Sequence, residues 1–339
     1  MYHWLRHGLF RLEPEKAHDL AMASLDVGAR FNLLKTLYPP PQDCPVDCMG
    51  LRFKNPVGLA AGLDKDGDHI DALGSLGFGF IEVGTVTPKP QPGNDRPRMF
   101  RLASHGALIN RMGFNNQGVD HLVENLKKRR YTGIVGTNVG KQKDTPIDQA
   151  ASDYAICIEK VFGHCDYITI NISSPNTKNL RALQDQGHLA ELLSELVGVR
   201  NSLAEKHQTQ RPMLIKIAPD WEEAALIQAL ETIGASGTDG LIATNTTLDR
   251  QAVKDHPLAH ETGGLSGRPV TQASNHVLAM ARQILGPEFP LVGVGGIASG
   301  ADAAKKHQLG ADLVQIYTGL IYEGPKLIKE CVTAWPETR

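Results

Sequence analysis

Residues 167–177 read Tyr167-Ile168-Thr169-Ile170-Asn171-Ile172-Ser173-Ser174-Pro175-Asn176-Thr177. An apolar, strand-forming run ends here in two asparagines, hydroxyl groups and a proline. Amides and hydroxyls are costly to bury unless they are paired, so such a cluster at the end of a strand is typical of a site for a polar ligand. A strand followed by an Asx or Ser turn is the simpler explanation for one isolated segment. At least four other strand ends carry comparable groups, which favours a ligand site.

The chain outside this segment repeats the same pattern of a strand followed by a helix. Between the apolar runs lie amphipathic stretches at 119–130, 189–206, 222–233 and 301–309. Nearly continuous apolar strands separated by helices indicate a parallel sheet covered on both faces. Eight such units favour a (β/α)8 TIM barrel over a doubly wound sheet, since no G-x-G-x-x-G motif follows the first strand. The expected strands are 57–61, 80–84, 134–138, 167–171, 213–217, 240–244, 291–295 and 313–317.

In a barrel the residues that follow the strands meet at one end, and that end carries the active site. Amides, hydroxyls and two lysines dominate this set and carboxylates are scarce, which suits a planar, neutral-to-anionic ligand with carbonyl and ring N–H groups. Glycine-rich turns after the last two strands, 294–300 and 317–319, favour a phosphate group by analogy with other barrels. The set comprises Gly62, Asp64, Lys65, Thr85, Asn138, Asn171, Ser174, Lys216, Thr244, Asn245, Thr246, Gly295, Gly296, Tyr317 and Thr318.

Composition limits the remaining possibilities. The chain has 339 residues, 41% of them hydrophobic, and a net charge of -2, which gives no electrostatic basis for binding nucleic acid. The five cysteines are odd in number and lack paired spacing, so we expect neither disulfides nor a metal site. Cys44 and Cys48 alone are too few for an iron–sulfur centre. No apolar run is long enough to span a membrane, and the N-terminus lacks a signal-peptide pattern.

The first forty residues predict two short amphipathic helices. Trp4, Leu5, Leu9 and Leu12 fall near helical spacing between basic residues, and a second pattern runs over 17–31. A helical lid on the core and an interfacial foot at a membrane surface explain this pattern about equally well. The proline-rich segment 38–43 then predicts a stiff linker. We therefore expect a helical subdomain over 1–40 and a catalytic barrel over 46–339.

The motifs taken together resemble the dihydroorotate dehydrogenase family over about residues 46–330. Members of its soluble class carry a cysteine as catalytic base, whereas Ser174 and the helical N-terminal extension resemble the membrane-associated, quinone-dependent class 2. The segments that carry the resemblance are 55–65, 82–88, 110–116, 171–177, 243–247 and 263–267.

The resemblance implies a flavin enzyme that uses FMN to oxidise (S)-dihydroorotate to orotate in de novo pyrimidine (UMP) biosynthesis and passes the electrons to a membrane quinone. Residues implied to hold FMN are Ala61, Gly62, Leu63, Asp64, Lys65, Thr85, Asn138, Asn171, Lys216, Thr244, Gly267, Gly296, Tyr317 and Thr318. Residues implied to surround orotate are Lys65, Asn110, Arg111, Met112, Gly113, Phe114, Asn171, Asn176, Asn245 and Thr246.

Ser174 is the implied base that removes a proton from C5, while hydride leaves C6 for the flavin. No histidine stands beside Ser174 in the sequence, so we expect Thr177 and a water beneath Phe114 to pass the proton onward. Lys216 is expected near flavin N1 and O2, where its charge stabilises the reduced ring.

The class further implies that the N-terminal helices bind the cytoplasmic face of the bacterial inner membrane peripherally and admit the quinone between them. His18 and Ala21 are expected to line that passage, and Arg101 and Tyr317 to flank its inner end. We expect a monomer.

Two other classes of protein also fit the strand ends. A non-redox barrel lyase or isomerase with a phosphorylated substrate would use Lys65 or Lys216 as a Schiff base and would be colourless. A non-catalytic binding protein on a barrel scaffold is disfavoured by the crowding of Lys, Asn and Ser at the strand ends.

Overall fold

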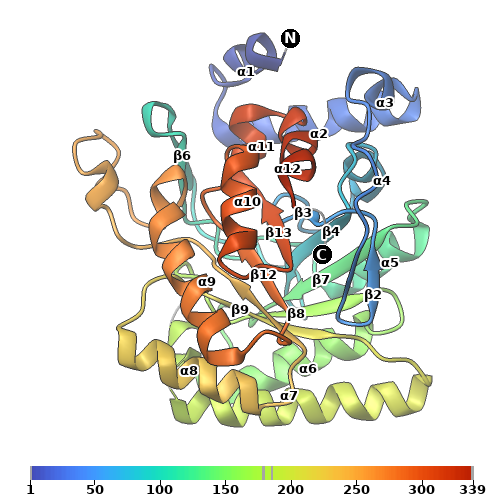
Figure 1. Ribbon diagram of the computed structural model, residues 1–339, viewed down its shortest axis with the longest axis vertical. Coiled ribbons are helices and arrows are strands. Elements are labelled where there is room, and N and C mark those ends of the chain that lie inside the picture. Colours follow the sequence, from blue (N-terminus) through green and yellow to red (C-terminus); the bar gives the residue numbers. More distant parts are fainter. Residues whose placement is uncertain (1, 178–179, 185, 337–339) are drawn as a thin grey trace.

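Eight parallel strands close into a barrel in the computed structural model, which describes residues 2–177, 180–184 and 186–336 (Figure 1). Their order around the barrel is β10-β12-β13-β3-β4-β7-β8-β9. The predicted (β/α)8 fold is therefore confirmed. The strands are β3 (Val57–Leu59), β4 (Phe80–Val86), β7 (Ile134–Val139), β8 (Tyr167–Asn171), β9 (Met213–Ile217), β10 (Gly240–Ala243), β12 (Leu291–Val294) and β13 (Leu313–Ile316).

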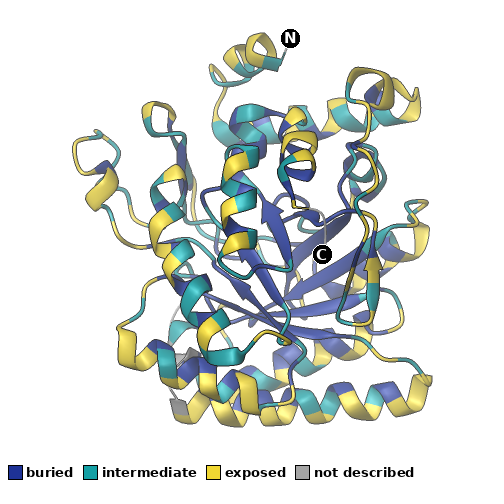
Figure 2. Ribbon diagram, in the orientation of Figure 1, coloured by how far each residue is buried: buried dark blue, intermediate teal, exposed yellow. Residues whose placement is uncertain are grey.

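Helices surround the barrel with one apolar face turned inward. In α5, Val119, Leu122, Val123 and Leu126 are buried at the i, i+3, i+4, i+7 spacing of an amphipathic helix. Figure 2 shows the result, with buried strands inside a ring of helices whose outer faces are exposed. The helices are α4 (Ile70–Gly74), α5 (Val119–Lys128), α6 (Ala150–Val161), α7 (Gln186–His207), α8 (Glu223–Ala235), α9 (Thr271–Leu285), α10 (Gly300–Gln308), α11 (Thr318–Glu323) and α12 (Lys326–Ala334). Short 3-10 turns are η1 (Ala103–His105), η2 (Ile147–Gln149), η3 (Leu180–Gln184), η4 (Gln251–Val253) and η5 (Arg268–Val270).

Two small antiparallel sheets were not predicted from the sequence. The hairpin of β1 (Val46–Cys48) and β2 (Leu51–Phe53) turns at Met49 and Gly50, both with positive φ, and packs its apolar side chains against one end of the barrel interior. The second sheet has the order β11-β6-β5, with β5 (Met99–Leu102), β6 (Ala107–Asn110) and β11 (Gly264–Gly267). Because β6 and β11 carry Asn110 and Gly267, this second sheet places two of the predicted contact residues on neighbouring strands.

Three helices precede the barrel: α1 (Tyr2–Leu9), α2 (Pro14–Arg30) and α3 (Leu33–Leu37). The two expected helices are present, and α3 is an addition. Tyr2 Oη donates to the Ile321 carbonyl at 2.7 Å, and the Phe10 ring packs edge-on against Tyr322 with centroids 5.4 Å apart. These contacts place α1 beside α11, at the top of Figure 1. Among the described residues, no helix is both long and apolar enough to cross a membrane.

A buried ion pair joins α2 to the segment just before β5. Arg98 Nη2 and Glu15 Oε1 are 2.9 Å apart, and both residues are only 6% exposed. Arg98 also donates to the carbonyls of Pro92 and Asn94. Removing one partner of a buried pair leaves the other charge uncompensated, whereas a solvent-exposed pair contributes little to stability.

We expect Arg98→Met to lower the free energy of unfolding by about 3–5 kcal/mol, because Glu15 stays buried and keeps only the exposed Arg96 as an ion-pair partner within the described residues. Arg52→Met, which breaks an ion pair with Asp47 whose side chains are 69% and 70% exposed, is the matched control. The control should cost less than about 1 kcal/mol. Urea unfolding of both variants measures the difference, and equal losses would contradict a structural role for the buried pair.

Candidate active site

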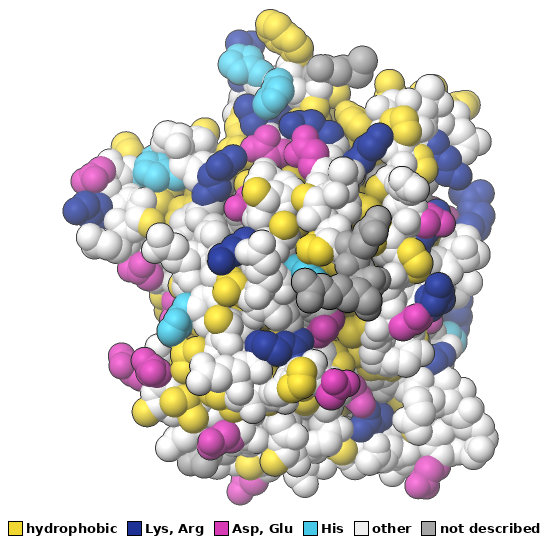
Figure 3. All heavy atoms as spheres, in the orientation of Figure 1, with side chains coloured by type: hydrophobic (Ala, Val, Ile, Leu, Met, Phe, Trp, Pro, Cys, Tyr) yellow, Lys and Arg dark blue, Asp and Glu magenta, His cyan; other side chains and the backbone are white. Residues whose placement is uncertain are grey.

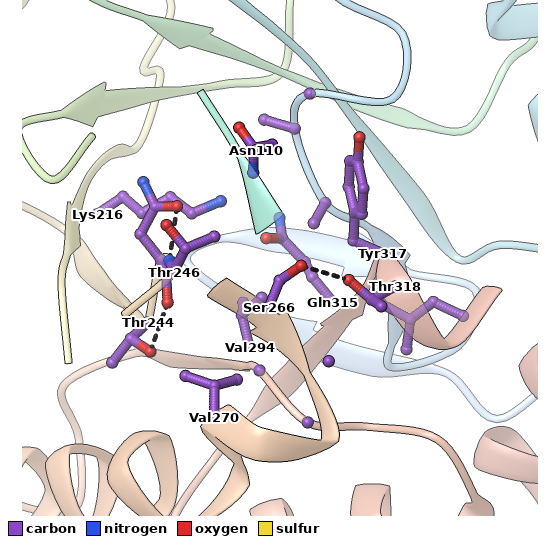
Figure 4. A pocket seen from close by; sticks show the side chains of 18 of the residues that line it. Asn110, Lys216, Thr244, Thr246, Ser266, Val270, Val294, Gln315, Tyr317 and Thr318 are labelled. Atoms are coloured by element: carbon purple, nitrogen blue, oxygen red, sulfur yellow. Dashed lines mark hydrogen bonds between the residues drawn. The ribbon is translucent and has the colours of Figure 1, made fainter. Parts of the chain in front are cut away.

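A cavity opens at the end of the barrel where the strands finish, and the β11-β6-β5 sheet forms part of its wall (Figure 4). Most of the residues expected around the ligands line it. They are Ala61, Gly62, Lys65, Thr85, Asn110, Met112, Gly113, Phe114, Asn171, Ser174, Asn176, Lys216, Thr244, Asn245, Thr246, Gly267, Gly296, Tyr317 and Thr318.

Five of the expected residues lie outside the cavity wall. Leu63 packs in the hydrophobic core, and the Asp64 carboxylate turns away to accept the backbone N–H groups of Asp68 and His69 at 3.0 and 2.9 Å. Burial raises the pKa of Asp64 to about 6. Arg111 Nη1 lies 2.6 Å from Glu261 Oε2, and the Arg111 guanidinium group lies over the Phe100 ring. Asn138 and Thr177 are buried behind residues that do line the cavity.

A buried hydrogen-bond network fixes the orientation of the side chains at the bottom of the cavity. Asn171 Nδ2 donates to Thr85 Oγ1 at 3.0 Å and to Asn138 Oδ1 at 3.1 Å. Thr85 Oγ1 donates to the same Asn138 oxygen at 2.5 Å, and Asn138 Nδ2 donates to Glu82 Oε1 at 2.8 Å. Asn138 therefore acts from behind the wall, by orienting the two residues that face the cavity.

Glu82, at the centre of this network, was not identified from the sequence. Its other oxygen accepts from Tyr167 Oη at 3.0 Å, Thr169 Oγ1 at 3.2 Å and Gln315 Nε2 at 2.7 Å. Since Gln315 gives its amide nitrogen to Glu82, its Oε1 is left buried and without a hydrogen-bond partner in the described part of the chain. Gln315 lines the cavity, so this unpaired acceptor lies in its wall. A polar residue inside an apolar strand was the available signal for both residues.

Two lysines border the cavity in different surroundings. Lys216 is 4% exposed, and burial lowers the pKa of its ammonium group, while the nearby Glu82 carboxylate acts in the opposite direction. Lys65 Nζ donates to the Gly62 carbonyl at 2.9 Å, and burial also lowers its pKa. The buried Lys216 and the half-buried Lys65 thus place two cations at the cavity wall, where they favour an anionic or electron-rich ligand.

The serine-containing turn after β8 is held by its own polar side chains. Ser173 Oγ donates to Asn171 Oδ1 at 3.1 Å and accepts from Asn245 Nδ2 at 2.9 Å. Ser174 is 6% exposed, lines the cavity, and accepts only a 3.3 Å bond from the Asn176 N–H within the described structure. Thr177 Oγ1 is buried with no hydrogen-bond partner among the described residues. Ser174 is therefore free to face a ligand, and the Thr177 hydroxyl has capacity for a water.

Glycines shape the part of the wall after β12 and β13. Gly295 and Gly296 have φ of +115° and +79°, and a Cβ atom at Gly296 would lie 2.0 Å from Thr271 Oγ1. Thr318 Oγ1 donates to Ser266 Oγ at 2.9 Å across this region, as the dashed line in Figure 4 shows. A narrow backbone wall with hydroxyl groups beside it suits a phosphate group. The contribution of Ser266 and Arg268 to this wall was not predicted from the sequence.

The residues expected along a quinone passage are spread between α2 and the cavity. Tyr317 lines the cavity, and Arg101 Nη1 donates to the Leu12 carbonyl at 2.8 Å, in the connection between α1 and α2. His18 lies on α2, and burial, reinforced by Lys65, lowers its pKa to about 4. Ala21 lies one turn further along α2. Tyr322 lines the cavity and also packs on Phe10, so the N-terminal segment touches the cavity wall.

Comparison with known proteins finds similarity to one family over nearly the whole chain. A sequence model of the family described as dihydroorotate dehydrogenase matches residues 44–337. The dihydroorotate dehydrogenase (quinone) of Marinobacter nauticus is 54% identical over 334 residues, which cover 98% of each chain. The protein of that name from Burkholderia pseudomallei is also 54% identical, again with 98% of each chain covered. The crystal structure of DHODH from Eimeria tenella in complex with ferulenol superposes with a TM-score of 0.86 at 35% identity, covering 97% of this chain and 93% of that one.

Proposed function

Because the chain belongs to the dihydroorotate dehydrogenase family, and to its quinone-dependent class, we propose that FMN is the flavin it uses and that the cavity at the barrel mouth holds FMN beside the substrate. The family assigns the reaction itself. The chain is a flavin-dependent oxidoreductase that oxidises dihydroorotate to orotate in pyrimidine biosynthesis, with a quinone as electron acceptor. The observation that carries the FMN proposal is a cavity with fixed amides, a buried lysine and a glycine-lined wall at one barrel end.

The residues of the cavity fit the two ends of FMN. Thr85, Asn171 and Lys216 would face the flavin ring, whose edge carries carbonyl and N–H groups, with the unpaired Gln315 oxygen in the wall beside them. The glycine wall that includes Gly296 would accommodate the phosphate. Bound there, FMN would supply the acceptor for the hydride that leaves C6 of (S)-dihydroorotate. Lys216 would stabilise the negative charge that develops on the ring.

Dihydroorotate presents a carboxylate, two ring carbonyls and ring N–H groups, and the remaining wall of the cavity offers matching partners. Asn176 Nδ2 donates to the Asn110 carbonyl at 3.1 Å, and Asn245 Oδ1 accepts the Thr246 N–H at 2.8 Å. These bonds hold the two amide side chains beside the cavity and leave some of their donors and acceptors free for a ligand. Lys65 supplies the cation for the carboxylate. Met112, Gly113 and Phe114 would close the pocket over the substrate.

Ser174 would remove the proton from C5, because its hydroxyl faces the cavity and accepts only one long hydrogen bond from the protein within the described residues. Serine alone is a weak base, so the proton must move on as it is taken up. The unpartnered Thr177 hydroxyl supports a relay through a water. Phe114, 8% exposed, would keep bulk water away from this path.

We further propose that the N-terminal helices, a subdomain over 1–40, dock on the cytoplasmic face of the bacterial inner membrane and lead the quinone past His18, Ala21 and Arg101 to Tyr317, with the barrel over 46–339 acting as a monomer. Support comes from large apolar side chains left exposed on these helices and in the segments between them, and Figure 3 shows hydrophobic side chains beside His and Lys or Arg where α1 lies. The exposed apolar residues are Trp4, Leu5, Leu12, Leu20, Val27, Phe31, Leu33 and Leu37.

The double substitution Trp4→Glu and Phe31→Glu is expected to weaken binding to anionic phospholipid vesicles at least about tenfold, because it removes side chains that are 83% and 67% exposed and adds two negative charges. Ile156→Glu, at a 39% exposed apolar position on α6, is the matched control and should bind like the wild type. Co-sedimentation with vesicles measures both proteins. Unchanged binding of the double variant would contradict the docking proposal.

The visible spectrum of the purified protein, recorded without oxygen before and after adding dihydroorotate, tests the proposed cofactor and site. We expect a yellow flavin band that bleaches on addition, and mass spectrometry of the released chromophore should identify FMN. A different released flavin would overturn the FMN assignment. A colourless protein that takes up no FMN on reconstitution would overturn the proposed site and favour a non-redox barrel enzyme.

A further inference from the structure

Lys306 is a buried cation that the reaction described above does not use. It lies on α10 and is 1% exposed, and its Nζ donates to Ser274 Oγ at 2.5 Å. Ser274 is fully buried on α9, and its hydroxyl donates in turn to the Val294 carbonyl at 2.5 Å. Two hydrogen bonds, with the Ser274 hydroxyl between them, therefore link the Lys306 ammonium group to the end of β12.

This pair of side chains lies directly behind the glycine wall of the cavity. Val294, Gly295 and Gly296 line the cavity from within. A Cβ atom at Gly295 would lie 3.0 Å from Ser274 Oγ, so no other group separates the serine from the backbone of the wall. A Cβ atom at Gly293, two residues earlier, would lie 3.1 Å from Lys306 Cδ. Only one layer of backbone thus stands between the Lys306–Ser274 pair and the cavity.

The protein provides little negative charge for this ammonium group. Within the described residues Lys306 forms no ion pair. Asp302, one turn earlier, is the one carboxylate that raises its pKa, and Asp302 already accepts from the Ala298 N–H and from Ser299 Oγ. Burial lowers the pKa of Lys306 to about 7. A buried cation without a paired anion is costly, and an anion in the cavity beyond the wall would offset that cost.

We propose that Lys306 is an internal counter-charge for the flavin phosphate, acting across the Gly295–Gly296 wall through Ser274 as a positioning residue that never touches the ligand. This inference rests on the proposed placement of the FMN phosphate at that wall. It predicts that Lys306 contributes to the preference of the protein for FMN over riboflavin, which has the same ring system and no phosphate.

The test is the dissociation constants of FMN and riboflavin, measured with full-length protein freed of flavin, for the wild type and for Lys306→Met. Methionine keeps an unbranched apolar stem, one heavy atom shorter than lysine, and removes the charge. We expect FMN to bind roughly ten- to hundredfold more weakly to this variant, as expected for losing one opposite charge across a thin, poorly hydrated layer. Riboflavin binding should remain near the wild-type value, which separates this effect from general damage to the pocket.

Lys305→Met is the matched control, because Lys305 is the adjacent residue on the same helix and is exposed. It should leave both constants unchanged. Ser274→Ala, which removes the hydroxyl between Lys306 and the wall, should weaken FMN selectively and keeps the test decisive if Lys306→Met does not fold. Equal weakening of both flavins, or an unchanged FMN preference, would overturn the role of Lys306. A wild type that does not prefer FMN over riboflavin would instead overturn the proposed phosphate position.

Discussion

Ser174→Ala is expected to slow reduction of the bound flavin by dihydroorotate by roughly 10²- to 10⁴-fold, the usual contribution of a positioned general base. The substitution removes the one hydroxyl that faces the cavity from the turn after β8. The Ser173 hydroxyl cannot replace it, because it is buried and bonded to both Asn171 and Asn245. The dissociation constant of orotate should stay close to the wild-type value, since orotate has already lost the C5 proton.

Anaerobic stopped-flow mixing, with flavin absorbance as the signal, measures the reductive step separately from quinone turnover. Ser104→Ala is a suitable control because Ser104 is an exposed serine. It should reduce at the wild-type rate. Wild-type flavin reduction in the Ser174 variant would show that another group takes the proton. A large rise in the orotate dissociation constant would mean that Ser174 binds the ligand.

The N-terminal helices show why the sequence alone left two explanations open. One face of α2 packs on the rest of the protein, because Glu15, Ala17 and Met22 are buried. Val27 on the same helix and Phe31 just after it are more than half exposed. A periodic pattern of hydrophobic residues indicates that one face of a helix avoids water, but not whether protein or lipid covers that face. Periodicity therefore could not distinguish helices packed on the protein core from helices that lie on a membrane surface. The structure supports a lid with an outer apolar face.

The strands and the membership of the cavity wall were largely predictable, for a physical reason. Parallel strands buried on both faces are read from apolar runs, and barrel closure brings their ends together whatever the loops do. Glu82 and Gln315 stood out only as polar residues within apolar strands, because a strand that is apolar on both faces gives no alternation to show which residues point into the barrel. Lys306 follows Lys305 in an ordinary helix, and only packing separates the buried lysine from the exposed one.

Contacts between segments that are far apart in the sequence also could not be predicted from the sequence. β6 pairs with β11 although Asn110 and Gly264, which face each other, are separated by more than 150 positions in the sequence. Each of these strands is only four residues long, too short for a periodic signal. Family resemblance supplied Asn110 and Gly267 as contact residues, but the sheet that joins them came from the structure.

Lys216→Met is expected to slow flavin reduction by roughly 10²- to 10³-fold, the usual effect of removing one group that stabilises developing negative charge. Lys216 is buried at the cavity wall, and the Glu82 carboxylate is the opposing charge that acts to raise the pKa of its ammonium group. Reduction adds electron density to the flavin ring, so losing this cation should also lower the midpoint potential of the flavin. Lys254→Met, at an exposed position, is the control and should change neither quantity.

Glu82→Gln separates the charge of Lys216 from its packing, because it removes the opposing negative charge while leaving the lysine in place. We expect this variant to raise the midpoint potential, the reverse of the change for Lys216→Met, since the cation is then less neutralised. The two potentials, measured by equilibration with a reference dye, give the sign of each effect. If both substitutions moved the potential in the same direction, loss of the shared network through Asn138 and Gln315 would explain the data better than charge, and Lys216 would lose its assigned role.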